Sequence, residues 1–295
     1  MKVGFIGTGH MGEPMAANVL AAEKSLFVHD SNRKATSNLE ASGADWCESL
    51  AEVASSSEVI LLSLPGPREV EAVGYELINS MSSGQTLVDM STNSPTLVKR
   101  IAKDAEDKGI GFLDAPVSGG VRRAREGALA IMVGGKDELF KKIEPLFDKI
   151  GNNVFHVGDV GAGSVAKLVN NMLAFAIMMS NNEALILGAK AGVDPNVLFN
   201  VIRTSSGNSM VWEGGARAIL RDRLKPNFTV DLACKDIGLA MDLAEELDID
   251  LPMVSNAQTL LNHYQANGFA QEDILGTVKA LEEASDVTVR GTWDE

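Results

Sequence analysis

The chain divides into two halves by its pattern of apolar and polar residues. In the first half, short apolar segments alternate with stretches of helical periodicity, an order that is typical of βαβ units. The apolar segments predict strands at Lys2–Ile6, Leu26–Val28, Val59–Ser63, Thr86–Asp89, Gly111–Leu113 and Leu129–Val133. We therefore expect a doubly wound, mostly parallel α/β sheet. Beyond about Val157 the strand pattern stops, and helical segments separated by Gly and Pro follow.

One helical segment, from Ser164 to Ala191, is apolar on nearly every side and is ended by Gly192. At about 1.5 Å per residue it would be roughly 40 Å long. A helix without a polar face must be covered all round, so we expect contacts with both halves of the chain and with a second subunit. The pattern predicts an α/β domain over residues 1–161, an interdomain helix over 162–192 and an all-helical domain over 193–295.

Composition narrows the functional classes. The net charge of −14 and the pI near 4.8 argue against nucleic acids and anionic membranes as partners, because both attract clustered Lys and Arg. The longest apolar stretch, Met172 to Met179, is shorter than the roughly 20 residues of a membrane span. Cys47 and Cys234 fit no metal-ligand spacing, and the four histidines are scattered. With no export signal at the N-terminus, we expect a cytoplasmic protein that holds no metal ion.

The first predicted strand leads directly into a glycine motif. Gly7-Thr8-Gly9-His10-Met11-Gly12 has the G-x-G-x-x-G spacing and opens a helical pattern. In this context Gly7 allows the turn, Gly9 the close approach of a pyrophosphate, and Gly12 the packing of helix on strand. The phosphates would lie at the helix N-terminus. The motif predicts a dinucleotide cofactor bound by Gly7, Thr8, Gly9, His10, Met11 and Gly12.

Asp30 ends the second predicted strand, 18 residues beyond Gly12. A carboxylate there hydrogen-bonds the adenosine ribose of NAD and repels the 2′-phosphate of NADP, so NAD is the favoured cofactor. NADP stays an alternative, because Asn32 and Arg33 follow closely and an arginine can accommodate that phosphate. In a different interpretation, Asp30 only caps a helix.

Further candidates follow strands whose carboxyl ends meet at one edge of the sheet, where such sheets bind ligands. Leu64 and Pro65 follow one strand. Thr92 follows the next and is a candidate near the nicotinamide ribose; alternatively it caps the helix after Pro95. The loop Ser118-Gly119-Gly120 offers a hydroxyl and successive backbone N–H groups that would cradle a carboxylate. The alternative is a flexible turn.

Lys167 and Asn171 lie four residues apart near the start of the long apolar helix, with Asn170 beside them. Residues at this spacing share a helix face, so both side chains would converge on one small ligand. Burial destabilises an ammonium ion, which would let this lysine exchange a proton near neutral pH. Alternatively, Lys167 extends its ammonium group from a core helix to solvent and the asparagines cap backbone groups.

Four motifs in this order resemble the β-hydroxyacid dehydrogenase family over essentially the whole chain. The motifs are Gly7 to Asn18, Asp114 to Gly120, Gly161 to Asn171 and Lys235 to Ala240. The family includes 3-hydroxyisobutyrate dehydrogenase, tartronate semialdehyde reductase and 2-(hydroxymethyl)glutarate dehydrogenase and, more distantly, 6-phosphogluconate dehydrogenase.

The resemblance implies a Rossmann domain, a helical domain, a homodimer or homotetramer, and reversible oxidation of a short β-hydroxy acid to its semialdehyde or keto form. Lys167 is then the catalytic acid and base, which accepts the alcohol proton while a hydride leaves for NAD or NADP. The other implied roles are carboxylate binding by Ser118, Gly119 and Gly120, substrate anchoring by Asn171 and Asn170, and a cofactor-side position for Lys235.

Two segments depart from the common pattern. Arg122 and Arg123 follow the Ser-Gly-Gly loop, and we hypothesise that one of them contacts a second anionic group of the substrate. The alternative is a pair of solvated surface arginines. Asn208 and Trp212 are candidate pocket residues in the helical half, although a core position for Trp212 is the simpler interpretation.

Two other functions stay open from the sequence. One is imine reduction on the same scaffold, and the other is a cofactor-binding module without turnover. Lys167 and the carboxylate-binding loop favour the dehydrogenase over both.

Overall fold

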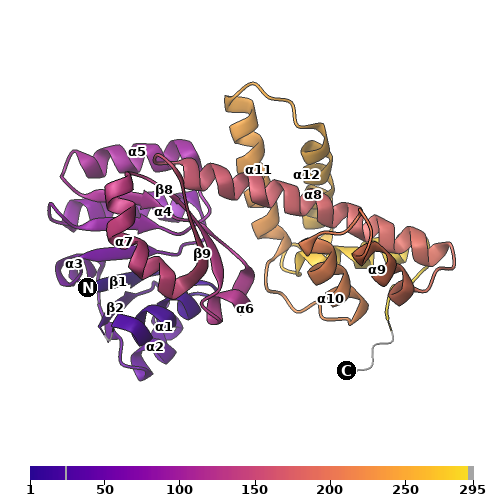
Figure 1. Ribbon diagram of the computed structural model, residues 1–295, viewed down its shortest axis with the longest axis horizontal. Coiled ribbons are helices and arrows are strands. Elements are labelled where there is room, and N and C mark those ends of the chain that lie inside the picture. Colours follow the sequence, from indigo (N-terminus) through magenta and orange to yellow (C-terminus); the bar gives the residue numbers. More distant parts are fainter. Residues whose placement is uncertain (24, 292–295) are drawn as a thin grey trace. The chain divides into compact units, whose positions relative to one another are not determined.

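The computed structural model describes residues 1–23 and 25–291 of the chain (Figure 1). It forms two compact units, unit 1 over Met1–Lys167 and unit 2 over Leu168–Glu295. All named strands of the described residues lie in unit 1. The described part of unit 2 consists of helices and one isolated bridge between Thr229 and Asp273.

Unit 1 contains a nine-stranded sheet. Its strands are β1 (Val3–Ile6), β2 (Leu26–His29), β3 (Asp45–Trp46), β4 (Val59–Leu62), β5 (Thr86–Asp89), β6 (Gly111–Asp114), β7 (Val117–Ser118), β8 (Leu129–Gly134) and β9 (Gly151–Gly158). The spatial order is β3-β2-β1-β4-β5-β6-β8-β7, with β9 paired to β8. The strands β1 to β6 run parallel, and the order reverses between β1 and β4, the switch point at which such sheets bind ligands. The predicted doubly wound, mostly parallel sheet is confirmed.

Helices cover both faces of this sheet. One face carries α1 (Gly12–Glu23), α2 (Ser37–Ala41), α6 (Gly120–Arg125) and α7 (Asp137–Ile150), and the other carries α3 (Leu50–Ser56), α4 (Pro67–Ser80) and α5 (Pro95–Glu106). Successive strand residues point to opposite faces, so Phe5 joins the core on the first face and Ile6 the core on the second. Burial on both faces explains why these strands are continuous apolar runs.

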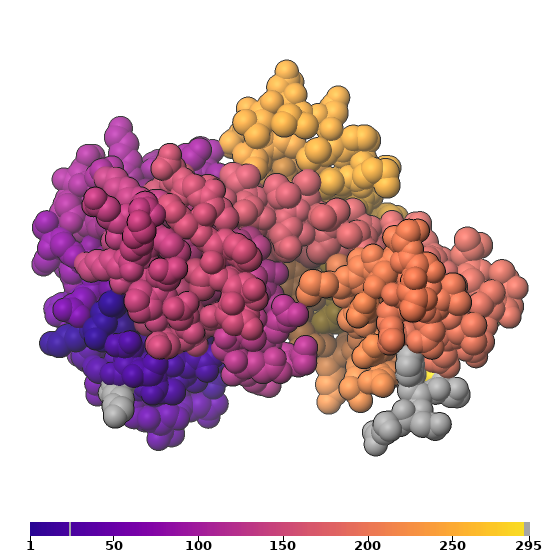
Figure 2. Space-filling view, viewed as in Figure 1, coloured from indigo at the N-terminus to yellow at the C-terminus, as the bar shows by residue number. Residues whose placement is uncertain are grey.

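Three strands were not predicted from the sequence. β3 and β7 have two residues each, too few for a pattern. β9 pairs with β8 and keeps most of its residues exposed, Phe155 to 52%. Figure 2 shows the segment around α7 and β9, in rose, on the surface of unit 1. A strand without a buried face gives no apolar signal, which is why the sequence did not reveal it.

Unit 2 is built around the long helix α8 (Ala162–Lys190), which begins in unit 1. The helices that follow are α9 (Pro195–Arg203), α10 (Arg217–Leu220), α11 (Val230–Glu246), α12 (Pro252–Tyr264) and α13 (Val278–Ser285), with short turns η2 (Trp212–Ala216), η3 (Gln265–Phe269) and η4 (Ile274–Thr277). The 3₁₀ turn η1 (Arg33–Thr36) belongs to unit 1.

Helix α8 is the core helix of unit 2. Phe175 and Met179 pack with α11 and α12, while Leu185 and Ile186 pack with α9, α10 and α13. By length and composition alone α8 is apolar enough to cross a membrane, so the expectation that no apolar stretch is long enough is wrong. This is a weak indication, because core helices meet the same criterion. Its packing in two core clusters accounts for part of its apolar composition, while Val169, Leu173 and Leu187 on the same helix are exposed.

Candidate cofactor and catalytic site

Of the three motif glycines in the loop between β1 and α1, only Gly9 leaves open space for a ligand. Gly7 has a φ of +87°, and a Cβ there would lie 2.2 Å from the carbonyl oxygen of Ser63. A Cβ on Gly12 would lie 1.8 Å from the carbonyl oxygen of Gly7, whereas a Cβ on Gly9 would meet nothing within 4 Å. Gly7 and Gly12 thus close a tight turn and Gly9 keeps its surface open, which fits the backbone approach of a pyrophosphate.

Asp30 connects this loop to the end of β2. Its Oδ2 accepts hydrogen bonds from the backbone N–H of Thr8 at 2.7 Å and from the Thr8 hydroxyl at 3.3 Å. Its Oδ1 accepts from the N–H of Asn32 at 2.8 Å. The N-cap of η1 is Asn32, whose side chain accepts from the N–H of Lys34, so the interpretation of Asp30 as a helix cap is wrong.

The other loop residues differ in their surroundings. Thr8 is buried and His10 is exposed, while Met11 packs partly buried against the core beneath α1. The structure therefore leaves His10 and Gly9 accessible beside the N-terminus of α1.

A hydrogen bond connects the segments that follow β4 and β5 at the same edge of the sheet. The backbone N–H of Leu64 donates to the Ser91 hydroxyl at 2.9 Å, and Pro65 follows in the exposed turn before α4. The N-cap of α5 is Ser94, which accepts from the N–H of Leu97. The interpretation of Thr92 as the cap of this helix is therefore wrong.

Two buried carboxyl groups follow at the ends of β5 and β6, where Asp89 and Asp114 are partners in the strand register. Asp89 accepts hydrogen bonds from the N–H of Ser91 at 2.9 Å and from Asn93 Nδ2 at 3.1 Å. Burial nevertheless raises the pKa of Asp89 to about 6, and the charge of Asp114 adds to the rise. Neither acid was expected from the sequence to have a role in the site.

The Asp114 side chain accepts hydrogen bonds from backbone N–H groups at the N-terminus of α8. Its Oδ1 accepts from the N–H of Gly161 at 2.8 Å and its Oδ2 from the N–H of Ser164 at 2.7 Å. Burial raises the pKa of Asp114, and these two N–H groups oppose the rise. The carboxyl group thus takes the place of a capping side chain. A Cβ on Gly163 would lie 2.7 Å from the Asp114 carbonyl oxygen, so this approach needs glycine. Lys167 is half-buried in the next turn of the helix.

The predicted carboxylate loop combines a short strand and a helix start. Ser118 pairs with Ala130 across β7 and β8, and α6 begins at Gly120. Gly119 and Gly120 have φ values of +135° and +71°, the left-handed region that favours glycine. The interpretation as a flexible turn is wrong, because strand pairing and helix formation fix both sides of the segment.

A second polar cluster, within unit 2, joins α8 to α11. Asn171 is 6% exposed and donates its Nδ2 to Asp236 Oδ2 at 2.7 Å, while Asn170 Nδ2 donates to Asn171 Oδ1 at 3.0 Å. Lys235 Nζ forms an ion pair with Asp236 Oδ1 at 2.7 Å. Asp236, itself 2% exposed, therefore links Lys235 with Asn171, although no role was expected for it from the sequence.

Two family models match the chain. One, described as the NAD binding domain of 6-phosphogluconate dehydrogenase, matches residues 2–158, and one described as the NAD-binding of NADP-dependent 3-hydroxyisobutyrate dehydrogenase matches residues 161–281. The chain belongs to the β-hydroxyacid dehydrogenase family. The resemblance expected from the four motifs is confirmed.

Relatives of this enzyme match along nearly the whole chain. It is 38% identical over 295 residues to the 2-(hydroxymethyl)glutarate dehydrogenase of Eubacterium barkeri, covering 99% of this chain and 98% of that one. It is 38% identical over 276 residues to a 3-hydroxyisobutyrate dehydrogenase of Pseudomonas aeruginosa, with 90% and 93% covered. The solved 3-hydroxyisobutyrate dehydrogenase of Mycobacterium tuberculosis with L-serine superposes with a TM-score of 0.87 at 30% identity, covering 95% and 98%.

These relatives make the chain an NAD(P)-dependent oxidoreductase of the hydroxyacid type, as predicted. The two alternatives, imine reduction and cofactor binding without turnover, are not supported. A solved imine reductase of Myxococcus stipitatus has a TM-score of 0.63 at 18% identity, which shows a shared fold alone.

The two arginines of α6 have different surroundings. The Arg122 side chain is 81% exposed, and its Nη1 lies 3.6 Å from Glu126 Oε1. The aliphatic part of Arg123 lies against Gly119, where an added Cβ would be 2.9 Å from Arg123 Cδ. One arginine is thus at the surface of the helix and the other beside the Ser-Gly-Gly loop.

Trp212 belongs to the core of unit 2. It is 1% exposed, lies 6.0 Å from the Phe199 ring in a stacked arrangement, and donates its Nε1 to the Phe199 carbonyl oxygen at 3.2 Å. The core interpretation is confirmed and the pocket interpretation is wrong. Asn208 is exposed and donates to Glu213 at 2.7 Å.

No group of three or more His, Cys, Asp or Glu side chains in the described ranges, 1–23 and 25–291, has an arrangement that could hold a metal ion. Cys47 and Cys234 are both free thiols. Burial raises the pKa of each to about 11, so both are protonated at neutral pH.

Proposed function

We propose that this enzyme oxidises the hydroxyl group of a short β-hydroxy acid to the semialdehyde or keto form, reversibly and with NAD as the preferred cofactor. The observation that carries the proposal is the start of α8, where Asp114 caps the helix and so fixes the turn that bears Lys167. The names of two relatives support the substrate class, because 3-hydroxyisobutyrate and 2-(hydroxymethyl)glutarate both carry a carboxylate and a hydroxymethyl group.

In this proposal Lys167 acts as general base. It accepts the hydroxyl proton as the carbinol C–H bond breaks, and in the reverse direction it returns that proton to the carbonyl oxygen. NAD, when bound, supplies the hydride acceptor. The Ser118 hydroxyl and the backbone N–H groups of Gly119 and Gly120 bind the substrate carboxylate. Asn171 and Asn170 anchor the substrate through their amides.

The cofactor residues are proposed from the same edge of the sheet. The pyrophosphate would lie over Gly9, and the carboxylate of Asp30 would receive the adenosine ribose. The complete proposed set is Gly7, Thr8, Gly9, His10, Met11, Gly12, Asp30, Leu64, Pro65, Thr92 and Lys235.

We also propose a cytoplasmic homodimer or homotetramer. Val169 and Leu173 on α8 are 47% and 58% exposed, and Leu187 is 72% exposed. Val169 and Leu173 are one helical turn apart, and adjacent exposed apolar side chains of this kind mark protein interaction sites, which a second copy would cover. The proposed organisation is a cofactor domain over residues 1–161, an interdomain helix over 162–192 and a substrate and dimerisation domain over 193–295.

The test is a panel of substrates assayed by NAD⁺ and NADP⁺ reduction. The panel contains small β-hydroxy acids with one or two carboxylates, the same alcohols as methyl esters, and cyclic amines for the imine reaction. Turnover of the acids and not of the esters or amines is expected. Turnover of esters as fast as acids would contradict the carboxylate contact, and silence across the acids would contradict the substrate class.

Arg122→Ala and Arg123→Ala, assayed on the same panel, test a second anionic contact. We expect Arg123→Ala or Arg122→Ala to raise KM for dicarboxylates more than for monocarboxylates, because a guanidinium binds a carboxylate in bidentate geometry. Equal KM ratios in both variants and the wild type would contradict this contact.

A further inference from the structure

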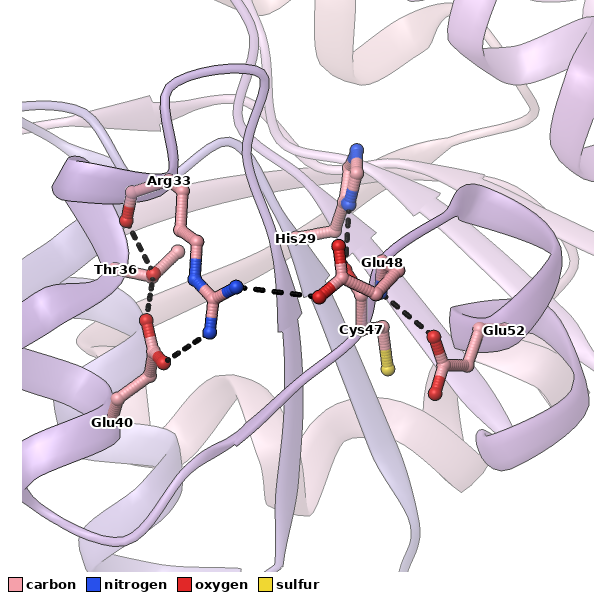
Figure 3. A network of polar contacts seen from close by, with 7 residues as sticks. All are labelled: His29, Arg33, Thr36, Glu40, Cys47, Glu48 and Glu52. Atoms are coloured by element: carbon pink, nitrogen blue, oxygen red, sulfur yellow. Dashed lines mark hydrogen bonds and ion pairs between the residues drawn. The ribbon is translucent and has the colours of Figure 1, made fainter.

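The segment after β2 contains an arginine, Arg33, with two carboxylates close to its guanidinium group. Arg33 follows Asp30 by three residues and begins η1, just after the strand whose end faces the adenosine ribose in such folds. Figure 3 shows its guanidinium between two carboxylates from different elements: Nη2 lies 3.5 Å from Glu40 Oε2 in α2, and Nη1 lies 3.3 Å from Glu48 Oε1 after β3. Each arm of the guanidinium is thus directed at a carboxylate.

A tryptophan lies under the same guanidinium. Arg33 Cζ is 5.0 Å from the centroid of the Trp46 ring, within cation–π distance. Trp46 in turn stacks on His29 with centroids 5.3 Å apart, and His29 Nδ1 lies 2.9 Å from the Cys47 carbonyl oxygen. β2 and β3 therefore supply a fixed surface for the arginine.

Neighbouring residues hold the Glu40 carboxylate and the Glu48 backbone. The Thr36 hydroxyl contacts both Glu40 Oε1 and the carbonyl oxygen of Arg33. Glu52 Oε2 accepts a hydrogen bond from the N–H of Glu48 at 2.7 Å, which fixes the backbone that carries this carboxylate (Figure 3). We call Glu40, Glu48 and Trp46 around Arg33 the acidic clamp.

The charges of Asp30, Arg33 and the two clamp glutamates add up to a negative value. Asp30, Glu40 and Glu48 contribute −3 and Arg33 contributes +1, which leaves −2. A 2′-phosphate brought to the end of β2 would therefore meet repulsion. A single exposed ion pair is weak, but here two carboxylates and one ring share the same guanidinium.

We propose that the acidic clamp holds Arg33 away from the adenosine ribose, and that the clamp and Asp30 together make the enzyme select NAD over NADP. This inference rests on the cofactor position proposed above. It assigns Arg33 to the fold of the loop rather than to phosphate binding, although its place after Asp30 suggested a phosphate contact.

The test compares dissociation constants of NAD⁺ and NADP⁺, measured by isothermal titration calorimetry without substrate. The double variant Glu40→Gln, Glu48→Gln preserves side-chain shape and changes the local charge from −2 to 0. We expect its ratio of the NADP⁺ constant to the NAD⁺ constant to fall about tenfold from the wild-type ratio. Adding Arg33→Ala to the double variant should restore most of the wild-type ratio, because the released arginine would then be missing.

Glu52→Gln is the matched control, since Glu52 lies in the same network without contacting Arg33 (Figure 3). Its ratio should equal that of the wild type. The proposal would be overturned if the ratio of the NADP⁺ to the NAD⁺ dissociation constant were unchanged in the double variant. It would also be overturned if the ratio stayed equally low after Arg33→Ala was added. If the double variant does not fold, Glu48→Gln alone gives the same comparison.

The cofactor position is tested separately by Gly9→Val, which should abolish binding of both dinucleotides. If Gly9→Val still binds NAD⁺, the proposed cofactor position is wrong. If Gly9→Val abolishes binding but the ratio in the double variant is unchanged, the proposed role of the acidic clamp is wrong and the proposed cofactor position is supported.

Discussion

At the residue scale, Asp89 is a carboxyl group whose burial disfavours its charge. Its pKa is raised from 3.8 to about 6, because desolvation outweighs the hydrogen bonds from Ser91 and Asn93. Between these two values the folded chain keeps a proton that the unfolded chain releases. Folding therefore takes up a proton in this range, and the stability that this group contributes is present at low pH and is lost as pH rises through about 6.

Asp89→Asn removes this titration while keeping the size of the side chain. From pH 4 to pH 7, the unfolding free energy of the wild type should fall by about 2 kcal/mol relative to that of the variant, since each pKa unit is worth about 1.4 kcal/mol and the unfolded carboxyl group is already more than half ionised at pH 4. Urea unfolding at several pH values measures the difference, with the exposed Asp148→Asn as control. If the unfolding free energies of wild type and Asp89→Asn change with pH in parallel, the raised pKa of Asp89 is ruled out.

At the scale of elements, the sequence predicts the parts that are buried and periodic. The apolar strands, the glycine turn and the long helix are predicted because each has a repeating or fixed spacing. β9 is missed because its residues are largely exposed, and Asp114 and Asp236 are missed as partners because their contacts cross long distances in sequence. Asn171 and Asp236, for example, are 65 residues apart. A buried acid directly after an apolar strand is the local signal that was available for Asp114.

Asp114→Asn tests the element that carries the proposed base. The variant loses the negative charge at the N-terminus of α8 and presents an NH₂ group to a backbone donor, so a stability loss of about 1–2 kcal/mol is expected. We also expect kcat to fall about tenfold or more with KM changed little, because Lys167 lies one turn further along. Thermal unfolding and steady-state kinetics measure the two effects.

Asp194→Asn is the matched control for this prediction. Asp194 caps α9 and also accepts two backbone N–H groups, from Asn196 at 2.9 Å and Val197 at 3.0 Å. It should lose a similar amount of stability with no change in kcat. If both variants lose kcat equally, the effect of Asp114 is general destabilisation and not the positioning of α8.

At the scale of the whole molecule, family membership, fold class and cofactor class are established by sequence pattern, structure and relatives together. The chain has 26 Lys and Arg residues but a net charge of −14, so an anionic substrate needs local positive charge, which the proposal places at Lys167 and at Arg122 or Arg123. The choice among short hydroxy acids depends on side-chain positions that no pattern along the chain encodes.

The proposed role of Lys167 as general base is tested by the Lys167→Ala variant, with NAD⁺ affinity and kcat determined on the same preparation. If Lys167 is the general base, the variant should bind NAD⁺ like the wild type and have a kcat lower by about 10²–10⁴-fold, the usual contribution of such a base. Lys190→Ala, which removes a lysine from the far end of the same helix, should retain full activity. A Lys167→Ala enzyme that binds NAD⁺ and turns over at nearly the wild-type rate would show that Lys167 is not the general base.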